Sequence, residues 1–251
     1  IYVYIFKKEC CMYYLGFIGF VTTTIGLSIG GLIALFLNRF QQSISTTYAL
    51  CAGMIIGLVY FEIAPESIKL GGWILFITGF LTGIFLFFII HKASHRIFRN
   101  ADKQNKNLYI RTGLFLMFSI SLHNFPLGIA FGSSQNMGLS NSVIQTIILH
   151  NIPEGIAMFT PLFLAKVKFH ASVLFAIIVS LPVGMGAILG SNIGLDHPLL
   201  WSLIISSAIG MMIIVTIKEI YFEALNQSSV VYSLLMTGIG TLIIWVYLNL
   251  I

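Results

Sequence analysis

The chain has 251 residues, of which 58% are hydrophobic and only 8% are charged, and its formal net charge is +5. Soluble domains carry about 25% charged residues, so this composition excludes a soluble domain. The small positive charge lies mostly between apolar stretches, which favours a role in membrane topology over a nucleic-acid partner. These stretches are roughly twenty residues long, the length of a membrane-spanning helix. We predict an all-α integral membrane protein with a single polytopic domain over residues 1–251.

The first eleven residues precede Met12 and carry Lys7, Lys8 and Glu9. Three interpretations stay open: a leader that is not native, the start of a helix, or a short tail. A signal peptide is not favoured, because no small-residue cleavage site precedes the next apolar span.

Eight apolar spans follow, joined mostly by short segments rich in turn-forming residues. They cover 14–37, 46–68, 72–91, 112–133, 142–164, 170–190, 200–222 and 230–250. The one long polar stretch, 91–111, is expected to be a cytoplasmic loop. It holds His91 and His95, and a solvated topology anchor is favoured there over a metal-collecting role.

The basic residues set the expected orientation by the positive-inside rule. With the N-terminus outside, nine Lys and Arg residues fall on inner segments and three on outer ones. Both termini are therefore predicted to lie outside a plasma membrane that the chain crosses several times.

Two spans share the pattern G-M-x7-E-I-x-x-E. It begins at Gly53 in the second span and at Gly210 in the seventh. These spans cross in opposite directions, and sequence symmetry between opposed segments is typical of inverted-repeat transporters. Spans 1–3 would then mirror spans 6–8, with spans 4 and 5 in the centre.

An eight-residue motif, H-N-x-P-x-G-I-A, begins at His123 in the fourth span and again at His150 in the fifth. Ionisable residues inside a span are costly and usually functional. Glu154 follows His150 by one helical turn, so both side chains project from one face. Asn124 and Asn151 add neutral oxygen donors, and the two prolines free backbone carbonyls.

Two imidazoles, one carboxylate and amide oxygens suit Zn²⁺, and also Fe²⁺, Mn²⁺ or Co²⁺, better than Ca²⁺ or Mg²⁺. The candidate metal ligands are thus His123, His150, Glu154, Asn124 and Asn151. The alternative is that both histidines only hydrogen-bond neighbouring helices. Cys10, Cys11 and Cys51 form no C-x-x-C pair, so neither a disulfide framework nor a thiolate site is expected.

Two pairs of glutamates lie near span ends, each pair one helical turn apart. They are Glu62 with Glu66, toward the outer surface, and Glu219 with Glu223, toward the inner one. They could collect a cation at the two mouths of a pathway, or be ordinary polar residues near lipid headgroups. Lys218 could neutralise Glu219 when no metal is present.

The two H-N-x-P-x-G copies, with Glu62, Pro65 and Glu66 as E-x-x-P-E, resemble the Zrt/Irt-like (ZIP) metal transporters, nearest the bacterial zinc-uptake and GufA-like branch. The resemblance covers the chain from about Gly16 onward. It implies eight helices in a 3+2+3 arrangement and uptake of a divalent metal as transported substrate, with no permanently bound cofactor. It also implies a metal centre between the fourth and fifth helices, in a homodimer.

Two positions depart from the family pattern. Leu127 stands where the fourth helix usually has Glu, and Val183-Gly184 replaces a Glu-Pro pair in the sixth helix. Both lost carboxylates would bridge or complete a two-metal centre, so a one-metal transporter is the natural inference. A non-transporting metal-sensing or assembly paralogue is the alternative. An intramembrane metalloprotease would need H-E-x-x-H or an equivalent, and no second His follows Glu154 on its turn.

Overall fold

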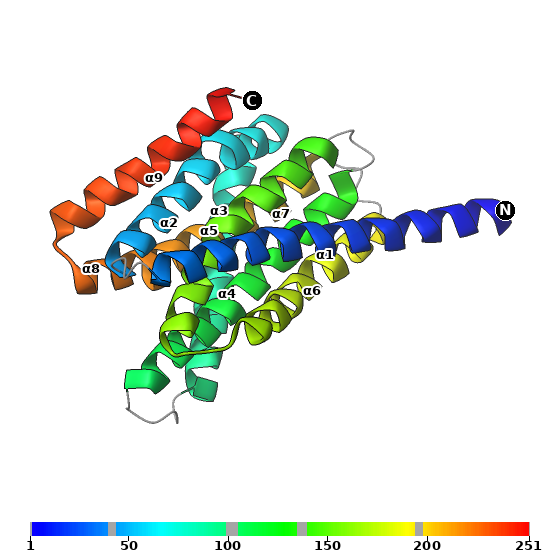
Figure 1. Cartoon of the computed structure of the whole chain (residues 1–251). Coiled ribbons are helices and arrows are strands. Elements are labelled where there is room, and N and C mark those ends of the chain that lie inside the picture. Colours follow the sequence, from blue (N-terminus) through cyan, green and yellow to red (C-terminus); the bar gives the residue numbers. More distant parts are fainter. Residues whose placement is uncertain (1, 40–43, 99–104, 135–139, 194–197, 251) are drawn as a thin grey trace.

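The computed structural model describes residues 2–39, 44–98, 105–134, 140–193 and 198–250, and within these ranges it contains helices and no strand (Figure 1). The elements are α1 Tyr2–Arg39, α2 Ile44–Leu58, the π-helix η1 Val59–Ile63, α3 Ala64–Phe98, α4 Asn105–Ser134, α5 Ser140–Leu164, α6 Phe169–Ile193, α7 Pro198–Val215, the π-helix η3 Thr216–Tyr221, α8 Phe222–Gln227 and α9 Val230–Leu250.

Seven segments of the described chain are long and apolar enough to cross a membrane. They agree with the predicted spans to within a few residues, except that the second and third predicted spans form one stretch, Ile44–Ile89. The prediction of an all-helical membrane protein is thereby confirmed. The expected 91–111 loop differs, because α3 continues to Phe98 and α4 begins at Asn105. His91 therefore lies in a helix, while the side chain of His95 is outside the described part of the chain.

Gly72 interrupts the long Ile44–Ile89 stretch with φ 73° and ψ 172°, a conformation that glycine adopts far more readily than other residues. Three contacts mark the route of the chain around it: Ser45 with Ala224, Ser67 with Ser202, and His91 with Glu219. The first and third lie at the α8 end of the bundle, and the second lies at the start of α7. The chain therefore crosses the bundle, turns at Gly72 and runs back.

These contacts define the two ends of the bundle. The Lys218 end holds Lys218, Glu219 and the start of α4. The Gly72 end holds Gly72, the start of α5 and the start of α7. The starting turns of α1 and the last turns of α9 both lie toward the Gly72 end, since α1 runs parallel to α5 and α9 runs parallel to α2.

The helices pack as two groups. The site group consists of α1, α4, α5 and α6, in which α1 packs on α5 and α6, and α4 packs on α6 and α5. The frame group consists of α2, α3, α7 and α9 with η1, η3 and α8, in which α3 packs on α7 and α2 packs on α9. The groups meet chiefly where α4 contacts α7 and α5 contacts α2.

Two glycines let neighbouring helices of the site group pack directly against the motif copies. A Cβ atom on Gly30 of α1 would collide with the carbonyl oxygen of Ile152, and one on Gly186 of α6 would collide with that of Phe125. Ile152 and Phe125 are the third residues of the two H-N-x-P copies. Small residues at such crossings let backbones pack directly in lipid. Each copy of the motif is thus held by a glycine from a different helix.

We expect Gly30→Ala and Gly186→Ala each to lower the melting temperature of the detergent-purified protein by several degrees, because overpacking a close crossing costs about 1–3 kcal/mol. Gly238→Ala is the matched control, since a Cβ at Gly238 meets nothing within 4 Å. Thermal unfolding followed by circular dichroism checks this. Equal melting temperatures for all three variants would contradict the packing.

Candidate metal centre

His123 on α4 and Glu154 on α5 form a buried contact between the two copies of the motif. His123 Nε2 lies 2.9 Å from Glu154 Oε1, and both residues are only 1% exposed. His123 Nδ1 lies 3.1 Å from the carbonyl oxygen of Ser119. A carbonyl can only accept, so Nδ1 carries a proton and donates it. The contact between Nε2 and the carboxylate then needs a second proton, which lies between the two side chains.

His150, on α5, holds the same ring tautomer. Its Nδ1–H donates to the carbonyl oxygen of Thr146 at 2.6 Å. Its Nε2 accepts from Asn151 Nδ2 at 3.1 Å, and that amide also donates to the carbonyl of Ile147 at 2.6 Å. Histidines that bind metal usually donate their other ring N–H to a fixed acceptor of this kind. Both rings are therefore oriented by backbone carbonyls through Nδ1, which leaves Nε2 as the ring nitrogen that could bind a metal.

Several polar atoms beside the two histidines are buried without a hydrogen-bond partner. They are Asn124 Nδ2 and Oδ1, Asn151 Oδ1 and Glu154 Oε2. An unsatisfied buried polar group costs about 1–3 kcal/mol, and more when it is charged. The three oxygens are ligands that a divalent cation accepts readily. The centre therefore holds oxygen atoms that could bind a cation and that accept no hydrogen bond from the protein.

The predicted ligands are brought together in part. His123 meets Glu154, and His150 meets Asn151. Within the described residues, however, no three His, Cys, Asp or Glu side chains gather closely enough to hold a metal ion. His123 and Glu154 instead contact each other directly, at 2.9 Å. In this geometry two of the candidate ligands, His123 and Glu154, bind each other.

Leu127 and Val183 occupy the positions where the resemblance led us to expect carboxylates. Both are buried, at 5% and 1% exposure. Leu127 lines a cavity of about 20 Å³ together with His150, Thr146 and Glu66. A leucine here supplies an apolar wall directly beside the histidine, where a glutamate would supply a further ligand.

The first glutamate pair lies close to this centre. Glu62, on η1, accepts a hydrogen bond of 2.6 Å from Thr146 Oγ1. Glu66 lines the same small cavity as His150. Since Thr146 lies one turn before His150 on α5, both carboxylates approach the centre from the Gly72 end.

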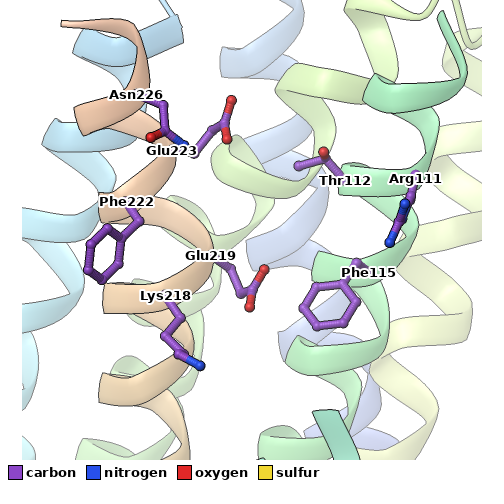
Figure 2. Close-up of a pocket in the computed structure, with 8 residues that line it drawn as sticks. All are labelled: Arg111, Thr112, Phe115, Lys218, Glu219, Phe222, Glu223 and Asn226. Carbon is purple, nitrogen blue, oxygen red and sulfur yellow. The ribbon is translucent and has the colours of Figure 1, made fainter. Parts of the chain in front are cut away.

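The second pair lies at the Lys218 end. Glu219 and Glu223 line a cavity of about 180 Å³ between η3, α8 and the start of α4, shown in Figure 2. Glu219 Oε1 lies 3.6 Å from Nδ1 of His91. Lys218 forms no ion pair with Glu219 among the described residues, although its charge acts on that carboxylate; its Nζ lies 4.8 Å from the centroid of the Phe88 ring, a cation–π contact. The partner of Glu219 in this conformation is a histidine that was expected in a loop.

Two features of the centre were not predicted. Glu62 and Glu219 both lie in π-helical turns, η1 and η3, which begin at equivalent positions of the G-M-x7-E repeat. Such turns are frequent at functional sites. Ser119 and Thr146 also hold equivalent places, because the motif begins four residues earlier than we recognised, as [Ser/Thr]-I-x-L-H-N. This longer match between the two motif copies is the sequence feature that identifies Ser119 and Thr146.

Comparison with known proteins finds a matching family and several similar chains. The family model of the ZIP zinc transporters matches residues 99–248, which include both motif copies and α7. The zinc transporter ZupT of Chlorobium chlorochromatii is 29% identical over 230 residues, covering 80% of this chain and 84% of that protein. The zinc transporter ZupT of Chlorobium limicola is 26% identical over 245 residues, covering 87% and 91%. That of Streptococcus mutans is 28% identical over 228 residues, covering 81% and 86%.

We expect His123→Ala to destabilise the metal-free protein by about 3–5 kcal/mol, because it leaves the Glu154 carboxylate buried without its partner. The double variant His123→Leu with Glu154→Leu removes both polar groups and should unfold at a higher temperature than the single variant. Thermal unfolding in chelator-treated detergent measures both. A double variant that melts at or below the single one would show that the pair is not coupled.

Proposed function

The chain belongs to the ZIP zinc transporter family, and from this we propose that it moves a divalent cation, zinc first among them, across the membrane into the cytoplasm. The proposed ligands are His123, His150 and Glu154, with Asn124 and Asn151 beside them. The observation that carries the proposal is the buried contact between His123 and Glu154, surrounded by oxygens without partners. Iron, manganese and cobalt fit the same donor set.

We infer eight crossings in a 3+2+3 inverted repeat. The reversal at Gly72 supports counting the Ile44–Ile89 stretch as two crossings. The packing supports the symmetry. The exchange pairs the first crossing with the sixth, the second with the seventh, the third with the eighth and the fourth with the fifth. It leaves the main contacts between helices unchanged. Under this exchange α1 on α5 becomes α6 on α4, and α2 on α9 becomes α7 on α3.

The Lys218 end is proposed to face the cytoplasm, with both termini outside a plasma membrane. Basic residues favour the cytoplasmic side. Among residues whose side chains are described, the Lys218 end carries Lys92, Arg111, Lys166, Lys168 and Lys218, and the Gly72 end carries Lys69. Glu62 and Glu66 then lie on the outer approach to the centre, and Glu219 and Glu223 lie on the inner one.

A cation entering the centre would compete with the proton between His123 and Glu154. Because a divalent ion attracts both side chains more strongly than one proton does, it separates them and recruits His150 and the amide oxygens. Two groups of helices can then move relative to one another, by an elevator or rocking motion, since the ligands all lie on the site group and the mouth glutamates all lie on the frame group. An incomplete ligand set favours transport over permanent binding, because the bound cation must also be released.

A non-transporting metal sensor or assembly partner is the second candidate. It is favoured by the buried apolar side chains of Leu127 and Val183, where family members usually carry carboxylates. We also propose a homodimer. Large apolar side chains of α3 and α9, such as Ile74, Leu81, Leu235 and Leu242, are exposed to whatever surrounds the chain, which in a membrane is lipid or a second copy.

Purified protein in liposomes should take up zinc, and we expect His150→Ala and Glu154→Ala each to lower the rate by more than about tenfold, because each removes a direct ligand. Ser121→Ala, on the same helix as His123, should transport at the wild-type rate. Uptake of zinc, iron, manganese and cobalt is measured with a fluorescent indicator inside the vesicles. No flux of any of these ions through folded protein would favour the sensor.

Leu127→Glu restores the carboxylate beside His150 and should raise the number of zinc ions bound per chain, or tighten binding by about tenfold. Equilibrium binding to detergent-purified protein measures this, with Leu127→Gln as the uncharged control. Unchanged stoichiometry and affinity would show that this position is not part of a lost second site.

A further inference from the structure

Thr146 joins the outer glutamate to the metal centre. Its hydroxyl donates to Glu62 Oε1 at 2.6 Å, and its carbonyl oxygen accepts from His150 Nδ1 at 2.6 Å. Thr146 belongs to the site group and Glu62 to the frame group. Their hydrogen bond therefore ties the two groups together at the Gly72 end.

Ser119 is the counterpart of Thr146 in the repeat, and Glu219 is the counterpart of Glu62. The carbonyl oxygen of Ser119 accepts from Nδ1 of His123 at 3.1 Å, as that of Thr146 does from His150. The hydrogen bond between Thr146 and Glu62 has no counterpart between Ser119 and Glu219. Glu219 lies 3.6 Å from His91 of its own frame group, and faces a cavity.

The cavities show the same asymmetry. Beside His150, on the Gly72 side, the space is about 20 Å³, enough for roughly one water molecule. At the Lys218 end the cavity is about 180 Å³, and Phe115 lines it. Phe115, Ser119 and His123 follow each other at intervals of four along α4, so one face of this helix leads from the cavity to the centre. The hydrogen bond between Thr146 and Glu62 therefore closes the Gly72 side of His150, while Glu219 borders a cavity at the Lys218 end.

We propose that Thr146 and Ser119 are alternating gate residues, each bonded to its glutamate in one of two conformations. In the present conformation Thr146 holds Glu62 and closes the Gly72 end. In the opposite conformation the two halves of the repeat exchange roles. Thr146 then releases Glu62, while the Ser119 hydroxyl donates to Glu219 and closes the Lys218 end. This inference rests on the proposed inverted-repeat transporter and adds the residues that stabilise each state.

The hydroxyls act as positioning groups, since neither is proposed to bind the cation. Releasing Glu62 frees its carboxylate at the moment when the Gly72 end opens, so an arriving cation meets an unoccupied ligand there. Releasing Glu219 does the same at the other mouth. At each end, the movement that opens the pathway thus also exposes the carboxylate.

Reactivity of single cysteines toward a membrane-impermeant thiol reagent tests the proposal in metal-free proteoliposomes. The background is the full chain with Cys10, Cys11 and Cys51 replaced by Ala, and the reporter is Ile63→Cys, whose side chain lines the small cavity beside His150. Thr146→Val removes one of the hydrogen bonds that join the two groups at the Gly72 end, so labelling should speed up on the order of tenfold. Ser119→Ala weakens the opposite state, so labelling should slow by a similar factor.

Three controls separate gating from general damage. Thr146→Ser keeps a hydroxyl and should restore the wild-type labelling rate. Ser121→Ala, two residues from Ser119, should leave the rate unchanged. All variants should elute as folded protein on size exclusion, and any variant that does not is replaced by Thr146→Ala or Ser119→Gly in the same assay.

Opposite shifts from Thr146→Val and Ser119→Ala support the gates, whether or not metal flux is detected. Shifts in the same direction, or no shift from either, overturn them. Opposite shifts in a protein without flux would keep the gates and reject transport, whereas flux without opposite shifts would keep transport and reject the gates.

Discussion

His123 and Glu154 face each other across 2.9 Å inside an apolar bundle, and the rest of the centre is arranged around that contact. A lone charge there would cost several kcal/mol, so each side chain needs the other, or a cation, at all times. Backbone carbonyls of α4 and α5 fix both histidine rings in one tautomer. Glycines on α1 and α6 allow those helices to pack directly against the two motif copies.

In the proposed transport cycle, this contact lies within the site group, which moves relative to the frame group. The proposed ligands belong to one group and the four proposed mouth glutamates to the other, so relative movement of the groups would change which glutamates the ligands meet. Glu62, bonded to Thr146, and Glu219, facing a cavity of about 180 Å³, show two different environments for equivalent residues. The two π-helical turns place both glutamates at the boundary between the groups.

Most of the architecture could be predicted from the sequence, because apolar spans of the right length leave few choices in a membrane. The repeats identified His123, His150 and Glu154 as candidates. The π-helical turns could not be predicted, since the surrounding residues suit an α-helix equally well. His91 was expected in a loop, because its polar neighbours hide the fact that α3 continues past it to Phe98. Its contact with Glu219 depends on packing between helices far apart in the sequence.

The central claim is that a cation replaces the direct contact between His123 and Glu154, with both histidines as ligands. X-ray absorption spectroscopy of the zinc-loaded protein tests this most directly. The account predicts imidazole nitrogens at about 2.0–2.1 Å together with oxygen ligands, and the loss of one imidazole contribution in both His123→Ala and His150→Ala. A zinc shell made of oxygen or sulfur alone, or one unchanged in both variants, would contradict it.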